Sequence, residues 1–193
     1  MRRRIGVAAI AAAALLGGAL MTGCSSEAPA PTALVIGDSL TVGAEIGGLG
    51  DDGTLVVDAQ EGRTTEEGAR VAEQADLDRY EQVIVALGTN DASDTEAQYA
   101  AKIDDLMAVL GPDVRVTWVN VDSGTPKLAP AATGVNAALA AAVDRHQNLS
   151  VADWDGFING RDDVDELRAG DQVHDSAEGY RVRARWMADL VRS

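Results

Sequence analysis

The feature that most constrains the fold is a regular alternation of short apolar runs with longer amphipathic segments. The apolar runs are rich in β-branched residues, are bounded by turn residues, and lie at 34–36, 55–57, 83–87, 114–121 and 149–152. Short runs without polar alternation are typical of strands buried on both faces. Between them, apolar residues recur at helical spacing in segment 64–75 and in three sets: Ala100, Ile103, Met107 and Leu110; Val135, Leu139 and Val143; Tyr180, Ala184, Met187 and Val191.

Strands that alternate with helices in this way predict a parallel sheet, because right-handed crossovers place the connecting helices on the two faces. We therefore predict an α/β fold: a three-layer α/β/α, doubly wound, flavodoxin-like domain whose parallel sheet has about five strands. Residues 33–193 would form this domain, and that length is sufficient for one core.

The first 23 residues do not fit this pattern. Arginines at positions 2–4 precede an alanine-rich apolar run at 5–21, which is the layout of a secretory signal peptide. The run is too short and too rich in alanine to predict a spanning helix. We expect residues 1–23 to be a leader that is removed.

Cys24 follows Met-Thr-Gly at 21–23, and this sequence resembles a bacterial lipobox, where cleavage precedes a lipid-bearing cysteine. It is the only cysteine in the chain, so an intrachain disulfide is excluded. An ordinary unpaired thiol is the alternative. We favour lipidation, with 24–32 as a short tether that holds the domain at the outer side of a membrane.

The chain is acidic, with a formal charge of −15, and loss of the leader arginines would make it more so. Such a charge disfavours nucleic acid and anionic polymers as partners. Neutral substrates fit better, although a solvated acidic surface alone would explain the composition.

Polar motifs follow the predicted strands. Gly-Asp-Ser-Leu at 37–40 follows the first strand, Gly62 lies beyond the second, and Gly-Thr-Asn-Asp at 88–91 follows the third. Asp171 and His174 precede the last helical segment. In a parallel sheet these segments meet at the edge formed by the strands' carboxyl ends, which is where such folds bind ligands.

The residue types suggest acyl transfer. We expect Ser39 to be the nucleophile, His174 its general base, and Asp171 the group that fixes the tautomer of the imidazole. The alternative for Asp38 and Ser39 is helix capping, and for Asn90 and Asp91 a turn or a helix N-cap.

Together, the four motifs resemble the conserved blocks of the SGNH or GDSL hydrolase family across nearly the whole predicted domain. Segments 116–121, 135–139 and 151–154 narrow the resemblance to the extracellular SGNH domain of bacterial cell-surface O-acyltransferases, including those that act on peptidoglycan. The resemblance implies an oxyanion hole made by the backbone N–H groups of Ser39 and Gly62 and by the Asn90 side chain.

This resemblance implies an extracytoplasmic serine esterase or acyltransferase that acts on short, acetyl-like esters of a cell-envelope carbohydrate. Hydrolysis and transfer remain open, and a catalytically silent glycan-binding module is an alternative. We expect a monomer without a cofactor.

A metal site is not expected. The chain has two histidines and one cysteine, which makes a zinc site improbable. The run Asp-Trp-Asp-Gly at 153–156 lacks the remaining ligands of a calcium loop, and His146 is assigned no role. Asp175 would favour the imidazolium form of His174, or else Asp175 or Ser176 would cap the last helix.

Overall fold

A computed structural model of the chain describes residues 33–47, 55–91 and 93–192. The predicted leader, Cys24 and the tether lie outside these residues. No helix in the described ranges is long and apolar enough to cross a membrane.

Five parallel strands form the sheet in the order β2-β1-β3-β4-β5. Their bounds are β1 Ala33–Gly37, β2 Leu55–Ala59, β3 Gln82–Ala86, β4 Arg115–Val119 and β5 Leu149–Ala152. This is the flavodoxin-like order, in which the chain reverses direction across the sheet between β1 and β3. The predicted fold class is confirmed.

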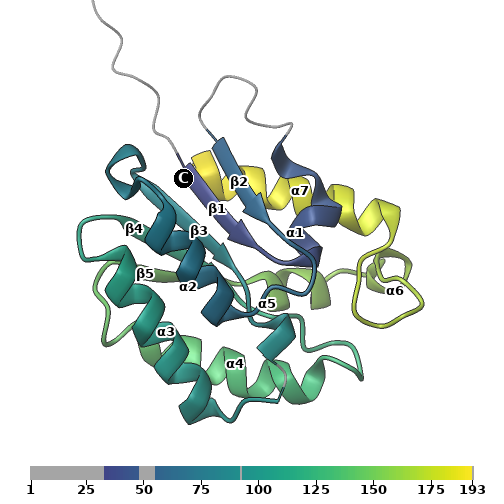
Figure 1. The fold of residues 1–193 in the computed structure, drawn as a ribbon. Helices are drawn as coiled ribbons and strands as arrows, with labels where there is room; N and C mark the ends of the chain where they lie inside the picture. The colour runs from purple at the N-terminus through teal and green to yellow at the C-terminus, as the bar shows by residue number, and fades with distance from the viewer. Residues whose placement is uncertain (1–32, 48–54, 92, 193) are drawn as a thin grey trace, which may run out of the picture.

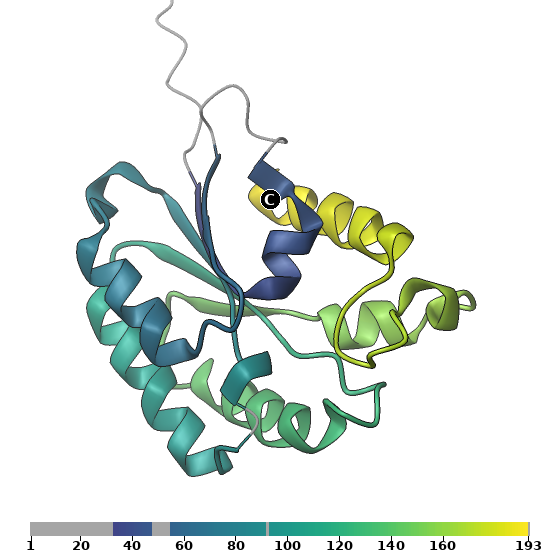
Figure 2. The same cartoon turned by 45° about the vertical axis from the view of Figure 1, so that its right-hand side comes forward.

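Helices cover both faces of the sheet (Figure 1). They are α1 Ser39–Ala44, α2 Thr65–Gln74, α3 Glu96–Leu110, α4 Ala129–Ala142, α5 Trp154–Asn159, α6 Val164–Leu167 and α7 Ala177–Arg192, with short 3₁₀ turns η2 Leu77–Arg79 and η3 Thr89–Asp91. α2, α3 and α4 lie on one face, and α1, α5 and α7 on the other (Figure 2).

Two hydrophobic cores result, one on each side of the sheet. Ile36, Val85 and Trp118 face α2, α3 and α4. Val35 and Ile84 face the opposite helices, where Met187 of α7 is fully buried. Alternate strand residues point to opposite faces, so β1 and β3 are buried on both sides. The prediction of burial on both faces is wrong for the run 55–57, because β2 is an edge strand in which Val56 is 40% exposed.

The sequence-based helix assignments needed two corrections. Val143 lies just beyond the end of α4 and is 39% exposed, so it does not belong to the buried face of that helix. The short helices α5 and α6 were not predicted, because four to six residues give too little periodicity to detect.

Candidate active site

Ser39 is the first residue of α1, directly beyond the carboxyl end of β1. Asp38 Oδ1 accepts a hydrogen bond from Leu40 N at 3.0 Å, so Asp38 caps the helix. A Cβ atom on Gly37 would lie 2.2 Å from Thr41 Oγ1. Glycine therefore permits the tight strand-to-helix turn that places Ser39 at the sheet edge.

The structure brings His174 to Ser39 across 135 residues of chain. His174 Nε2 lies 3.1 Å from Ser39 Oγ, and His174 Nδ1 lies 2.7 Å from Asp171 Oδ2. A carboxylate only accepts hydrogen bonds, so Nδ1 carries the proton and Nε2 can accept the proton of the serine hydroxyl. The His174 side chain is 38% exposed, which leaves the site open to a substrate.

Asp171 is held by three hydrogen bonds. Besides the imidazole, its carboxylate accepts from the backbone N–H groups of Val173 and His174, each at 3.0 Å. The bond from the His174 side chain, followed by the two backbone bonds, lowers the pKa of Asp171 well below its usual range. The carboxylate of Asp171 is therefore ionised at neutral pH.

The loop that carries these residues is closed by its backbone. Arg168 and Asp175 form an antiparallel bridge, and Ala169 N donates to His174 O at 2.9 Å. Gln172 has φ of 62°, a left-handed conformation that is uncommon for residues other than glycine. Position 172 was not singled out from the sequence, because a glutamine gives no signal for this conformation.

Gly62 and Asn90 lie on loops that flank Ser39, because β2 and β3 are the two neighbours of β1. Gly62 has φ of 74° and lies in the turn after β2. Asn90 Nδ2 donates to Arg63 O at 3.0 Å, which joins the two loops directly. An amide has two N–H groups, so the second is left to donate toward a ligand.

Arg63 was missed by sequence reasoning. Its side chain is buried and donates to the carbonyl groups of Gly37 and Asp58, while Nη2 lies 2.6 Å from Asp58 Oδ1. It therefore fixes the Gly62 loop to the ends of β1 and β2. A buried arginine has no periodic signal in a sequence, because only its tertiary partners account for its burial.

Asp91 joins segments that are distant in the chain. Its buried carboxylate accepts from Thr65 N at 3.0 Å and Thr65 Oγ1 at 2.9 Å, and it pairs with Lys102 at 2.7 Å. It thus holds the start of α2 and one side of α3, and it is not merely the turn or local N-cap considered above.

The last helix is capped by Ser176. Its Oγ accepts from Gly179 N at 3.2 Å, which confirms one of the two alternatives for positions 175 and 176. The carboxylates at 153–156 are also engaged: Asp153 caps α5 through Gly156 N, and Asp155 accepts from Ser123. No cluster of metal-ligating side chains occurs in the described ranges.

A cavity of about 320 Å³ lies beside the loop that carries Asp171 and His174, and polar and apolar groups line it in similar measure. Its lining residues are Gly124, Thr125, Pro126, Asp165, Arg168, Ala169, Gly170 and Gln172. Arg168 is fixed there by a bidentate ion pair with Asp122, with nitrogen to oxygen distances of 2.8 and 3.1 Å.

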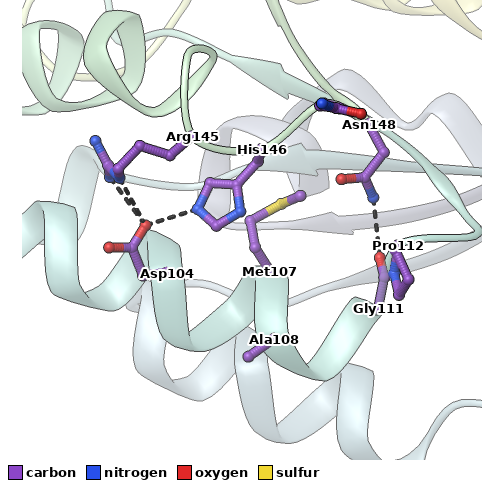
Figure 3. A pocket seen from close by; sticks show the side chains of 9 residues that line it. Asp104, Met107, Ala108, Gly111, Pro112, Arg145, His146 and Asn148 are labelled. Atoms are coloured by element: carbon purple, nitrogen blue, oxygen red, sulfur yellow. Dashed lines mark hydrogen bonds and ion pairs between the residues drawn. The ribbon is translucent and has the colours of Figure 1, made fainter.

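A larger cavity, of about 600 Å³, lies at the opposite edge, where α3 and α4 end and β5 begins (Figure 3). There His146 Nε2 lies 2.6 Å from Asp104 Oδ1, which also accepts from Arg145. None of the lining residues bears a hydroxyl or thiol. His146 therefore has no nucleophile beside it in this cavity. Its hydrogen bond with Asp104 connects the segment after α4 to α3.

Comparisons with known proteins support the fold. No family model matches the sequence, and no curated protein matches it either. Among solved structures, the catalytic domain of peptidoglycan O-acetyltransferase A from Streptococcus pneumoniae superposes with a TM-score of 0.69 at 18% identity, covering 84% of this chain and 93% of that one.

Two further structures show the same likeness. A lipolytic protein of the G-D-S-L family from Veillonella parvula has a TM-score of 0.67 at 17% identity, over 83% of this chain and 98% of its own. An acetyl esterase mutant with acetate has a TM-score of 0.64 at 16% identity, over 84% and 98%. The chain has the three-layer fold that SGNH and GDSL hydrolases share.

Proposed function

We propose that the chain is an SGNH-type serine esterase or acyltransferase that acts on short acyl esters outside the cytoplasm. The observation that carries this proposal is the chain of hydrogen bonds from Ser39 through His174 to Asp171. A serine hydroxyl becomes an effective nucleophile when a positioned base takes its proton. Here the base is oriented by a carboxylate that stays ionised.

In the proposed reaction, Ser39 Oγ attacks the ester carbonyl carbon while its proton passes to His174 Nε2. The carbonyl oxygen becomes an oxyanion that accepts from the N–H groups of Ser39 and Gly62 and from Asn90 Nδ2. Collapse of the tetrahedral intermediate breaks the bond to the alcohol, which leaves with the proton from His174. Water or a second alcohol then attacks the acyl-enzyme by the same steps in reverse.

A short acyl group and a carbohydrate alcohol suit the surroundings of this site. The cavity beside the loop of Asp171 and His174 has polar side chains, such as Asp165 and Gln172, that can bind the hydroxyl groups of a carbohydrate. Two of the similar structures are a peptidoglycan O-acetyltransferase domain and an acetyl esterase. We therefore propose an acetylated cell-envelope glycan as the substrate, and Cys24 as a lipid anchor.

The test is mass spectrometry of the intact protein during turnover of p-nitrophenyl acetate and longer homologues. We expect a transient gain of one acetyl group that is absent from Ser39→Ala, and turnover that falls as the acyl chain lengthens. Ser150→Ala, on β5 away from the site, is the matched control and should stay active. A silent glycan-binding module would show neither acylation nor turnover but would still bind sugar.

Hydrolysis and transfer are separated by their products. With a glycan acceptor present, a transferase yields acetylated glycan in place of free acetate. A hydrolase yields acetate in both cases.

A further inference from the structure

Arg183 of α7 is a buried cation whose partners are not immediately evident. Its side chain is 3% exposed, and neither Nε nor Nη1 has a hydrogen-bond partner among the described residues. Its guanidinium lies over the ring of Trp154, 4.8 Å from the centroid. An arginine keeps its charge when buried, and a buried charge is costly unless other charges compensate it. Packing against the Trp154 indole alone does not explain why an arginine occupies position 183.

Two buried carboxyl groups are influenced by the charge of Arg183. Asp38 is 1% exposed, and Asp175 Oδ2 is buried without a hydrogen-bond partner among the described residues. Burial raises the pKa of both groups, and the charge of Arg183 acts against that rise in each case. The packing agrees with this influence for Asp175: a Cβ atom on Gly179, one turn before Arg183 on α7, would lie 3.0 Å from Asp175 Cβ.

These carboxyl groups belong to the segments that carry the proposed catalytic residues. Asp38 caps α1 beside Ser39 and also forms a hydrogen bond with the side chain of Thr89, the neighbour of Asn90. Asp175 follows His174, and its backbone closes the catalytic loop against Arg168. The charge of Arg183 therefore influences one carboxyl group beside Ser39 and one beside His174, and the first of these also bonds to the neighbour of Asn90.

We propose that Arg183 is a positioning residue, whose buried guanidinium compensates the buried carboxyl groups of Asp38 and Asp175 and thereby holds Ser39 and His174 in place. This inference rests on the proposed function. The competing explanation is that Arg183 only fills space against Trp154.

Other charged groups surround this cluster and must enter any pH argument. Asp175 is influenced by Asp122, which raises its pKa, and by His174 and Arg168, which lower it. Tyr180 lies on the same helix as Arg183. Burial, Asp175 and Asp171 raise the pKa of Tyr180, and Arg183 lowers it. For Asp38, burial raises the pKa most, while Arg183 and the hydrogen bonds of Leu40 and Thr89 lower it; Asp38 in turn helps to raise the pKa of the buried Tyr99. Arg183 is the cation common to Asp38 and Asp175.

The test compares Arg183→Met, which removes the charge but keeps an unbranched apolar stem, with Arg183→Lys, which keeps the charge. Misplacing reacting groups by about 1 Å can cost about 100-fold in rate. We expect kcat for p-nitrophenyl acetate to fall by about 10- to 100-fold in Arg183→Met with little change in KM. The acid limb of its pH-rate profile should move to higher pH, because uncompensated carboxylates take up protons more readily.

Arg183→Lys should keep kcat within a few-fold of the wild type and leave the acid limb in place. Arg181→Met is the matched control, because Arg181 lies on the same helix but is exposed and pairs with Glu178. Unchanged kcat and an unmoved acid limb in Arg183→Met would overturn the inference. If Arg183→Met does not fold, Arg183→Gln replaces it, and equal activity of the Gln and Lys variants contradicts a role for the charge.

Amide hydrogen exchange provides a second measurement that needs no substrate. Arg183→Met should exchange faster than wild type in both 38–41 and 168–176, whereas Arg181→Met should not. Faster exchange confined to the surroundings of Trp154 would indicate packing alone and would also overturn the inference. A wild type without Ser39-dependent turnover would refute the proposed function, while the exchange experiment would still decide the role of Arg183.

Discussion

At the scale of single residues, the candidate site depends on the donor and acceptor groups that are not already used to stabilise the fold. Asp38 uses its carboxylate to cap α1, which leaves the Ser39 hydroxyl to meet His174. Asn90 uses one N–H group to bind Arg63 O, which fixes the amide plane and leaves its other N–H group free. A donor held in place before the reaction stabilises a developing charge without reorganisation.

Asn90→Ala should lower kcat for short esters by about 100-fold, since losing one oxyanion donor costs about that much. KM should change little, because the interaction is strongest in the transition state. Asn148→Ala is the control, because the amide of Asn148 also donates to backbone oxygens but at the opposite edge of the sheet. Equal turnover of the two variants would remove Asn90 from the mechanism.

Asp171→Asn should reduce turnover by about 100- to 10,000-fold, because an amide can donate to the imidazole and stabilise the wrong tautomer. The surface variant Asp189→Asn, in which the exposed pairing with Arg192 is lost, serves as control. Steady-state kinetics of the two variants gives the comparison. Retained activity in Asp171→Asn would mean that the backbone alone orients His174.

The same carboxylate makes the stability of the protein depend on pH. The pKa of Asp171 is lowered in the folded chain, chiefly by its bond with His174. Its stabilising contribution is therefore complete above the ordinary aspartate pKa of about 3.9 and is lost as the pH falls toward the lower pKa of the folded state. Urea unfolding at several pH values should show the wild type losing its advantage over Asp171→Asn in acid, and a constant difference would contradict this.

At the scale of elements, the site is held by contacts between α1, α7 and the loops that precede them. α1 has only six residues and so depends on its neighbours. It packs against α7 at Gly43, where a Cβ atom would lie 2.2 Å from Tyr180 Cζ. α7 in turn begins directly after the loop of Asp171 and His174. Ser39 and His174, the proposed nucleophile and base, are thus placed by one helix pair.

Gly43→Ala should destabilise the protein by about 1–3 kcal/mol, because the added methyl group overlaps the Tyr180 ring. Tyr180→Ala in the same chain should relieve the overlap, so the two changes should not be additive. Gly134→Ala is the control: it lies within α4, and its Cβ would meet no atom closer than 3.6 Å. Thermal unfolding measures all four variants, and full additivity would contradict the contact.

At the scale of the whole molecule, the sheet separates two cores, and the candidate site lies at the edge formed by the carboxyl ends of its strands. Parallel strands end on the same side, so the loops after β1, β2 and β3 converge there. The cavity lined by His146 lies at the other edge. There Arg145 forms an ion pair with Asp104, and His146 forms a hydrogen bond with the same carboxylate (Figure 3). The larger of the two cavities therefore lies away from the candidate site.

Cys24→Ser should release the protein from membranes. The predicted lipobox places the anchor nine residues before β1 begins at Ala33. In detergent phase partition of cells that express the chain, wild type should enter the detergent phase and Cys24→Ser the aqueous phase. Ser25→Ala should behave as wild type, and equal partition of Cys24→Ser and wild type would refute the anchor.

The fold class and the places of the motifs beyond the strands could be predicted from the sequence alone. Residues Val83 to Ala86 of β3 are all apolar and buried, which a sheet covered on both faces explains. Once the strands are parallel, residues that follow them share one edge. The proximity of Ser39 and His174 could therefore be predicted, although their catalytic roles remain a prediction.

Only the tertiary structure decided how that edge is held together. The left-handed conformation of Gln172, the bond between Asn90 and Arg63, and the burial of Arg183 depend on segments far apart in the chain. Burial of a charged side chain leaves no periodic pattern, because its compensation comes from partners that only folding brings near. Local patterns thus specify the elements, whereas the electrostatic support of the site arises from their packing.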